Sequence, residues 1–344
     1  MKRAIVVSGG GSKGAYAVGV LDQFKKDKPH LKFNVFVGTS TGALMAPFLA
    51  LDKFNDLVHI YQNTKTKEVL KEKDNKAVLK QSSLYSTTPL KKIIDKYLSD
   101  AECEKLLRSR TKDIHILTVC LQTKKLTVFS NRQLPISKSG IYDCIKMKSA
   151  QHLKRAMLAS ANQPIFMPPI KVNKDILSGD KAQRQYIDGG LAEYAGIEMA
   201  MDAQADEIFT IFLSSKEDQV STKTYSKIFD MLGPTVGILT GNVGFHDLRI
   251  PRIQNTHLQY LKLTKDRLLS AGVSQSKIDE AFNFTLPQQE FELRKAPHVI
   301  HLIRPSEVLK AGTNGLEFKP REMRKMFALG QKDGKEFMVG LKIT

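Results

Sequence analysis

The sequence has no tryptophan, and only three of its 344 residues are cysteines. Cys103, Cys120 and Cys144 form an odd set without the spacing of a metal site, so neither a disulfide framework nor a zinc site is indicated. We therefore expect reduced thiols, no metal and no other cofactor. Because tryptophan is absent, the 17 phenylalanines are expected to supply much of the aromatic packing.

Long apolar runs are also missing. Met1-Lys2-Arg3 is followed by only four apolar residues before Ser8, which does not fit the apolar region of a signal peptide. No stretch approaches the roughly 20 apolar residues that a membrane-spanning helix needs. We therefore expect a cytoplasmic protein that meets a membrane, if at all, peripherally at the inner surface.

Acidic residues are outnumbered, since 53 lysines and arginines stand against 35 aspartates and glutamates, for a formal net charge of +18. Such a charge favours an anionic partner, either phospholipid headgroups or nucleic acid, although lysines spread along a chain also simply keep a surface solvated. The densest basic stretch, 65–80, has no recognised nucleic-acid motif beside it. We expect contact with an anionic membrane surface and no nucleic-acid partner.

Apolar and helical patterns alternate through the first fifty residues, with strands expected at 3–8 and 33–37 and helices at 15–26 and 41–51. This alternation predicts a parallel sheet with right-handed crossovers, and hence an α/β fold. Later strands are expected at 114–121, 126–129 (as a hairpin with the preceding strand), 186–187, 208–213 and 300–303, and later helices at 149–160, 193–204 and 320–340.

Residues 215–295 have a variable, mainly helical pattern, and an apolar strand follows them. We therefore expect a catalytic core over 1–215, a helical insertion or cap over 216–297, and a late core strand with a C-terminal helix over 298–344.

One hydroxyl is placed between two glycines in Gly38-Thr39-Ser40-Thr41-Gly42, after an apolar run and before an apolar helical pattern. This is the strand–turn–helix setting in which G-x-S-x-G forms a nucleophile elbow. Glycines permit a turn tight enough to hold the serine in a strained conformation, and the start of the following helix favours developing negative charge.

A second glycine-rich segment, Gly9-Gly10-Gly11-Ser12-Lys13-Gly14, follows the first expected strand. Its G-x-G-x-x-G spacing also fits a dinucleotide site, but no strand ending in an acidic residue follows at the required distance, and Lys13 precedes Gly14 rather than the Ser or Thr of a P-loop. We expect the amides of Gly10 and Gly11 to donate to an oxyanion.

The residues alone leave more than one candidate for the general base. A serine of this kind usually pairs with histidine, and Asp188 followed by a later histidine would satisfy the chain order of an α/β-hydrolase triad. Asp188 itself precedes two glycines on a tight turn, where it is either a base or an ordinary turn residue. The histidines in the required position are His246, His257, His298 and His301.

Four motifs occur in one order: the glycine loop, the serine elbow, Ala159-Ser160-Ala161 with a following proline-rich stretch, and Asp188-Gly189-Gly190. In order and spacing, over roughly residues 1–215, the chain resembles the patatin-like phospholipases. The resemblance implies a three-layer α/β/α sandwich with a mostly parallel central sheet. It also implies a lipid acyl hydrolase that works through a Ser–Asp dyad without histidine.

The resemblance assigns a role to each motif. It implies Ser40 as the nucleophile, Asp188 as its base, and the glycine loop as the oxyanion hole with Lys13 at the family's basic position. The chain departs from many members at Ser8, where they carry Asp, and at 191–196, where they have an Asn-rich stretch. The other motif residues are Gly9, Ser12, Gly14, Gly38, Gly42, Gly189 and Gly190.

The expected activity is cleavage of fatty-acyl esters of the phospholipase A or lysophospholipase type, through an acyl-serine intermediate. One alternative is a lipase effector that a ligand or partner regulates through 215–295. The others are a conventional Ser–Asp–His esterase and a broad carboxylesterase without a membrane role.

Overall fold

The computed structural model describes residues 1–73, 81–134, 142–215, 224–226, 228–282, 297–312 and 315–341. Its centre is a sheet in the order β10-β9-β1-β2-β5-β6-β7, with β8 paired to β5. The strands are β1 Arg3–Val7, β2 Val35–Thr39, β5 Asp113–Cys120, β6 Leu126–Ser130, β7 Asp143–Lys146, β8 Tyr186–Asp188, β9 Glu207–Ile211 and β10 Val299–Ile303.

Most neighbouring strands run parallel, from β10 across to β5 and again between β6 and β7. The antiparallel pairs are β5 with β6 and β5 with β8. The carboxyl ends of β1, β2 and β9 therefore lie at one edge of the sheet, which is where open α/β sheets place their sites.

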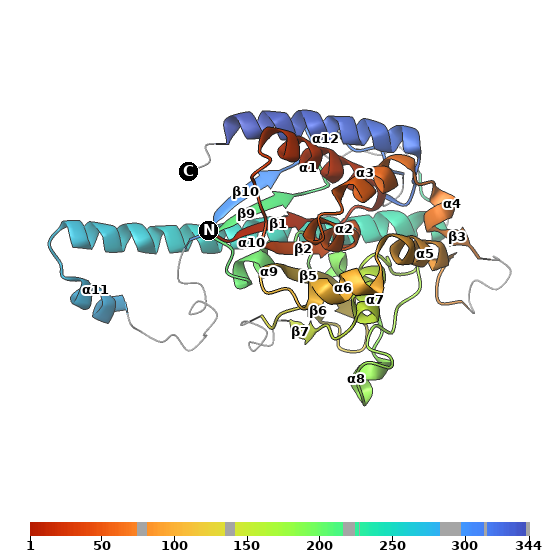
Figure 1. The fold of residues 1–344 in the computed structure, drawn as a ribbon, viewed down its shortest axis with the longest axis horizontal. Coiled ribbons are helices and arrows are strands. Elements are labelled where there is room, and N and C mark those ends of the chain that lie inside the picture. The colour runs from red at the N-terminus through yellow and green to blue at the C-terminus, as the bar shows by residue number, and fades with distance from the viewer. Residues whose placement is uncertain are drawn as a thin grey trace.

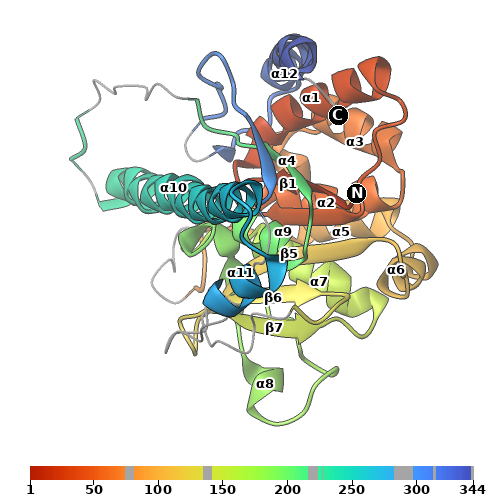
Figure 2. The same cartoon turned by 90° about the vertical axis from the view of Figure 1, so that its left-hand side faces the viewer.

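Both faces of the sheet are covered. Along β1, Ile5 and Val7 belong to one buried cluster, and Ala4 and Val6 to another on the opposite face. The first cluster is closed by α1 Gly14–Asp27, α2 Thr41–Ala50 and α12 Pro320–Gly340, the second by α9 Ile197–Asp202. Figure 2 shows α10 Ile228–Ser270 on the same side as α9.

The remaining elements are short or peripheral. The first-face cluster also takes in residues of α3, α5, α6 and α7. Their bounds, with those of the other elements, are α3 Phe54–Asn63, α4 Thr66–Val69, α5 Thr88–Tyr97, α6 Asp100–Leu107, α7 Ala150–Ser160, α8 Asp180–Gln183, α11 Gln275–Phe282, β3 Lys71–Glu72, β4 Tyr85–Ser86, η1 Gly11–Lys13 and η4 Gly189–Leu191.

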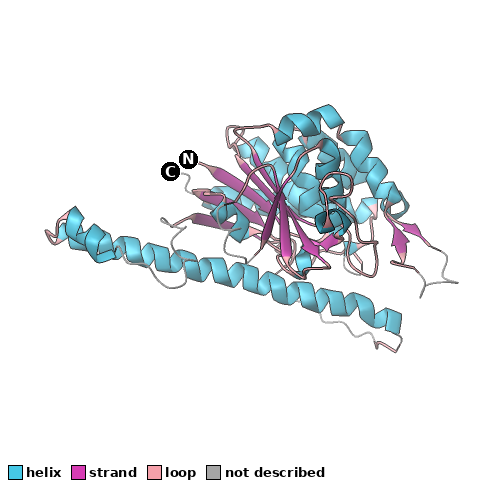
Figure 3. Ribbon diagram, turned by 90° about the horizontal axis from the view of Figure 1, so that it is seen from below, coloured by secondary structure: helices cyan, strands magenta, loops and turns pink. Residues whose placement is uncertain are grey.

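Helix α10 dominates the outline of the molecule. Its 43 residues, about 65 Å at 1.5 Å per residue, run along the sheet and continue past it, as Figures 1 and 3 show. Helix α11 follows near its far end. Within the described ranges, none of the helices, α10 included, combines the length and apolarity required of a transmembrane span.

The predicted fold class, a mostly parallel sandwich with a large helical region in the C-terminal third, is confirmed. The hairpin of β5 and β6 forms, turning through Lys124 at positive φ. The helix expected at 193–204 begins only at Ile197, because 191–196 forms a loop, and β7 was not predicted. Parts of the helical prediction for 215–295, namely 216–223, 227 and 283–296, lie outside the described residues.

The C-terminal helix joins the fold through glycines. A Cβ atom on Gly19 of α1 would overlap the carbonyl of Phe327, and one on Gly330 of α12 would overlap the carbonyl of Tyr16. The two helices therefore pack backbone to backbone, and neither glycine tolerates a side chain.

Gly330→Ala is expected to lower the free energy of unfolding by about 1–3 kcal/mol, because the added methyl must force α12 away from α1. Gly340→Ala in the same helix is the matched control, since a Cβ there meets no atom within 4 Å. Thermal and urea unfolding of the two variants measure the difference. Equal stabilities would contradict the close helix contact.

Candidate active site

Ser40 occupies a strained turn between β2 and α2. Its φ of 56° and ψ of −119° lie where a non-glycine residue is rarely found. A Cβ on Gly42 would overlap the carbonyl of Val7 in β1, and one on Gly38 would overlap the backbone of Gly42. The G-x-S-x-G spacing is therefore a steric requirement of this turn.

Hydrogen bonds from a distant helix hold the turn. The Ser40 amide donates to Oγ of Ser160 at 2.9 Å, and the Ser160 hydroxyl donates to the carbonyl of Leu117 at 2.6 Å. Ser160, at the end of α7, thus ties the elbow to β5. From the sequence, Ser160 was identified only as part of a motif. Its role as a buried hydrogen-bonding partner of the elbow was not predicted.

Asp188 lies beside Ser40 at the end of β8. The strand pairs antiparallel with β5, placing Asp188 opposite Thr118, and the Asp188 amide donates to the carbonyl of Asn162 at 3.0 Å. The carboxylate accepts a hydrogen bond from the Gly190 amide at 2.8 Å, and the Ser40 hydroxyl lies near enough to lower its pKa. Both side chains are buried, each residue with 5% of its surface exposed.

Burial raises the pKa of Asp188 to about 6, although the hydrogen bond from Gly190 and the nearby Ser40 hydroxyl act in the opposite direction. A carboxylate with such a pKa is ionised near neutral pH and is a stronger base than an ordinary aspartate. It is therefore matched to removing a proton from a hydroxyl at neutral pH.

The glycine loop lies next to the elbow. Gly10 and Gly11 have φ values of 156° and 56°, conformations that side chains disfavour. The Gly9 amide donates to the carbonyl of Tyr194 at 3.3 Å, so the amides of Gly10 and Gly11 are the loop's candidate oxyanion donors. Burial lowers the pKa of Lys13, the loop's cation.

The other motif residues have packing positions. Ser12 is fully buried. A Cβ on Gly14 would overlap side chains of α2 and α3, and one on Gly189 would overlap the carbonyl of Leu117. Gly190 lies in the polar cavity described below and donates to Asp188.

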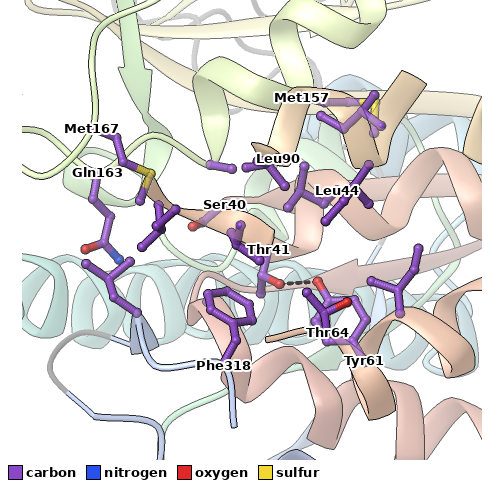
Figure 4. A pocket seen from close by; sticks show the side chains of 18 of the residues that line it. Ser40, Thr41, Leu44, Tyr61, Thr64, Leu90, Met157, Gln163, Met167 and Phe318 are labelled. Carbon is purple, nitrogen blue, oxygen red and sulfur yellow. Dashed lines mark hydrogen bonds between the residues drawn. The ribbon is translucent and has the colours of Figure 1, made fainter. Parts of the chain in front are cut away.

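Two cavities meet at Ser40. The narrower, here called the apolar cavity, has a volume of about 70 Å³, and Figure 4 shows Ser40 among its side chains, with Thr41 hydrogen-bonded to Tyr61. Its lining is Gly11, Ser40, Thr41, Leu44, Phe48, Leu57, Ile60, Tyr61, Thr64, Val69, Leu70, Leu90, Ile93, Ile94, Met157, Ala161, Gln163, Met167, Leu316 and Phe318.

The wider, here called the polar cavity, has a volume of about 600 Å³ and contains Asp188, the glycine loop and one side of α10. Ser40 and Gln163 line both cavities, so Ser40 lies at their junction. The rest of its lining is Gly9, Gly10, Lys13, Pro164, Asp188, Gly190, Leu191, Tyr194, Phe212, Ser214, Ser215, Val236, Gly237, Thr240, Gly241, Gly244, Phe245, Leu248 and Arg304.

Histidine is absent from the described lining of both cavities. His298 lies at the amino end of β10, opposite the edge that carries Ser40, with Nδ1 2.6 Å from the carbonyl of Ala205. His301 contacts Glu207 at 3.0 Å, and His246 and His257 are exposed on α10.

A model of the patatin-like phospholipase family matches residues 5–201, which is more than half of the chain. The chain belongs to this family. Membership in the patatin-like phospholipases makes it a lipid hydrolase, as the sequence motifs suggested. All four motifs lie within the matched residues, whereas α10, β10 and α12 lie outside them.

The crystal structure of VipD from Legionella pneumophila is among the solved structures similar to this patatin-like chain. It has 11% sequence identity and a TM-score of 0.44, and the match covers 98% of this chain and 67% of VipD. A comparison with curated proteins gives no match.

The stretch in which the chain departs from many patatin-like members connects several parts of the site. The Glu193 carbonyl accepts from the hydroxyl of Thr39 at 3.1 Å, and the Tyr194 carbonyl accepts from Gly9. Asp247 of α10 accepts from the amides of Tyr194 and Ala195. The pKa values of Glu193 and Asp247 are both raised, chiefly by burial, so the pair favours holding a proton.

Proposed function

We propose that this chain hydrolyses fatty-acyl esters of phospholipids, as a phospholipase A or lysophospholipase, through a Ser40–Asp188 dyad. The observation that carries the proposal is that these two buried side chains line the same polar cavity where it meets the apolar cavity. An acyl chain matches the first cavity, and the alcohol portion of the lipid matches the second.

In the proposed reaction, Ser40 Oγ attacks the ester carbonyl while Asp188 takes the hydroxyl proton. The oxyanion that forms accepts hydrogen bonds from the Gly10 and Gly11 amides, and one such donor typically lowers the barrier by about 3 kcal/mol. The bond to the leaving alcohol breaks as that oxygen receives the proton from Asp188. Water, deprotonated by Asp188, then attacks acyl-Ser40 and releases the fatty acid and free Ser40.

We further propose a division of labour along the chain. Residues 1–215 are the catalytic core, 216–297 a helical cap, and 298–344 a late strand and C-terminal helix that complete the core. The net charge of +18 supports peripheral contact with anionic membranes, where each nearby Lys or Arg contributes about 1 kcal/mol.

A regulated hydrolase is a second candidate, supported by one observation. Helix α10 lines the polar cavity and is bonded through Asp247 to the loop that also holds Gly9. A ligand or partner that moved α10 would therefore change the cavity and the glycine loop together. Ester hydrolysis by the purified protein without any added factor would rule out an obligatory activator.

Ser40→Ala is expected to lower fatty-acid release from phospholipid vesicles by about 1,000-fold or more, because it removes the nucleophile. Asp188→Asn is expected to cost at least about 100-fold, the usual contribution of a general base. Mass spectrometry of the released fatty acid measures both effects. His246→Ala and His257→Ala serve as controls, and a dead histidine variant beside an active Asp188→Asn would refute the dyad.

The pH profile should show the titration of Asp188. Because the base must be ionised and its pKa is raised to about 6, kcat/KM should fall as pH drops below about 6 and be level above it. A soluble neutral ester is the substrate, so that only the enzyme titrates. The residual activity of Asp188→Asn should lack this acid limb, and an unchanged limb in that variant would assign it to another group.

A further inference from the structure

Arg304 enters the polar cavity from outside the family match. It follows β10, whereas the match ends at residue 201. Of the described residues that line this cavity, three belong to the acidic or basic types Asp, Glu, Lys and Arg: Lys13, Asp188 and Arg304. With Asp188 assigned to the reaction, the cavity keeps two cations that the proposed chemistry at the ester does not use.

The Arg304 guanidinium is held in a fixed place. Its Nε donates to the carbonyl of Ser214 at 2.9 Å and its Nη2 to that of Ser215 at 2.6 Å. It also lies over the ring of Phe212, 4.9 Å from the centroid. Such a cation loses little freedom when a ligand binds, because its position is already set.

The segment that holds Arg304 also packs on the oxyanion loop. A Cβ placed on Gly10 would lie 2.9 Å from the Leu213 side chain and 3.4 Å from the Cβ of Lys13. The Leu213 amide donates to Oγ of Ser8 at 2.9 Å. Lys13 and Arg304 therefore reach the polar cavity from two different parts of the chain, η1 and the residue that follows β10.

We infer that Arg304, together with Lys13, binds the phosphate of a glycerophospholipid in the polar cavity. A guanidinium donates charge-assisted hydrogen bonds to phosphate, and a lysine adds a point charge. Arg304 is then the residue that selects phospholipids over neutral glycerides. The inference rests on the proposed function, because it places the phosphate on the alcohol side of the ester that Ser40 attacks.

The test uses hydrolysis of p-nitrophenyl butyrate, a neutral soluble ester, with sn-glycerol 3-phosphate, inorganic phosphate or glycerol as the inhibitor. Glycerol 3-phosphate should compete and glycerol should not. Arg304→Gln should raise the inhibition constant of glycerol 3-phosphate at least tenfold, with less than a threefold change in kcat/KM for the neutral ester. Arg324→Gln, at an exposed position on α12, is the matched control.

A second arm compares phosphatidylglycerol with diacylglycerol in mixed vesicles, and Arg304→Gln should reduce only the first rate. If phosphate inhibition depends on Arg304 but this selectivity does not change, the site takes free phosphate and the assignment to a lipid headgroup is wrong. If Arg304→Gln lowers both rates equally and inhibition by glycerol 3-phosphate is unaltered, Arg304 only holds residues 214–215 in place and the inference is wrong.

A third measurement needs no variant. Glycerol 3-phosphate should slow the labelling of wild-type Ser40 by a neutral sulfonyl fluoride, and protection no better than that of glycerol overturns the inference. Failure of the proposed function is distinguishable, because the protein would then hydrolyse neither the soluble ester nor either lipid.

An independent observation concerns the outer side of α10. Of the 17 exposed large apolar residues in the described part of the chain, 10 lie on this helix. They are Met231, Ile238, Leu239, Phe245, Ile250, Ile253, Tyr260, Leu261, Leu263 and Leu269. Six of them fall within an arc of about 80° at 3.6 residues per turn and are here called the outer stripe: Met231, Ile238, Phe245, Ile253, Tyr260 and Leu263.

The outer stripe continues into the site, because Phe245 also lines the polar cavity. The opposite side of α10 carries the residues that bind the core, including the buried Val236, Asp247 and Asn255. Leu239, Ile250 and Leu261, which are also exposed, lie beside the stripe and broaden the apolar face. A broad apolar face on one side of a helix is what a membrane-surface helix presents.

Charge along α10 favours an anionic surface. The helix exposes Arg249, Arg252, Lys262 and Arg267 against one exposed carboxylate, Asp266. We propose that the outer stripe docks on an anionic lipid bilayer and so brings the polar cavity to its substrate. Aromatic and aliphatic side chains flanked by arginine and lysine are the composition of helices that lie in the membrane interface.

Flotation with phosphatidylglycerol–phosphatidylcholine vesicles tests this proposal, in the Ser40→Ala background so that no lipid is consumed. Replacing Ile238, Ile253 and Tyr260 by Gln should weaken vesicle binding at least tenfold, whereas the same change at Leu121, Val308 and Val339, also exposed, should not. In the active enzyme the α10 triple variant should hydrolyse p-nitrophenyl butyrate at the wild-type rate.

Unchanged vesicle binding by the α10 triple variant would overturn the docking proposal. So would a shift of the protein from dimer to monomer in sedimentation without a change in vesicle binding, because the stripe would then be an interface between copies of the chain.

Discussion

The contact between the backbone of α2 and the backbone of β1 determines the geometry of the whole site. Because Gly42 lies against the carbonyl of Val7, α2 can begin only one residue after β2 ends. Ser40, the residue between them, must take a positive φ to make this turn. A positive φ at a non-glycine residue costs of order 1–3 kcal/mol, and contacts with the surrounding structure offset this cost. Ser160 supplies a hydrogen bond to the strained amide from the end of α7.

The same edge of the sheet collects the other components from separate elements. The glycine loop follows β1, Asp188 ends β8, and the loop at 193–196 links both to α10. Asp247 has two amides of that loop as its donors, and its neighbour Glu193 is buried beside it. The site is therefore supported on the α10 side by a carboxyl pair, an arrangement in which one shared proton avoids two adjacent buried charges.

Much of this could be predicted from local sequence. The serine elbow, the glycine loop and the turn after Asp188 each carry glycines in short, recognisable patterns, and the alternation of strand and helix identified the parallel sheet. The position of Asp188 next to Ser40 needed the family resemblance, because residues alone left four histidines as candidates. Strand β7 has little apolar character and was not predicted.

Other features depend on contacts between distant segments and have no local signal. The bonding role of Ser160 requires β5 beside α7, and the placement of Arg304 requires β10 to join the sheet next to β9. The short loop at 191–196 interrupts an otherwise helical pattern, because its carbonyls and amides serve Gly9, Thr39 and Asp247 rather than a helix. Only the assembled structure supplies those partners.

The order of strands has a consequence for the boundaries of the folding unit. Strand β9 lies between β1 and β10, and it ends ten residues after the family match does. A polypeptide ending there would leave β9 as an open edge, α1 without the helix that packs on Gly19, and the amides of Tyr194 and Ala195 without their acceptor. The first 211 residues therefore cannot be expected to fold by themselves, because later segments supply all three of these contacts.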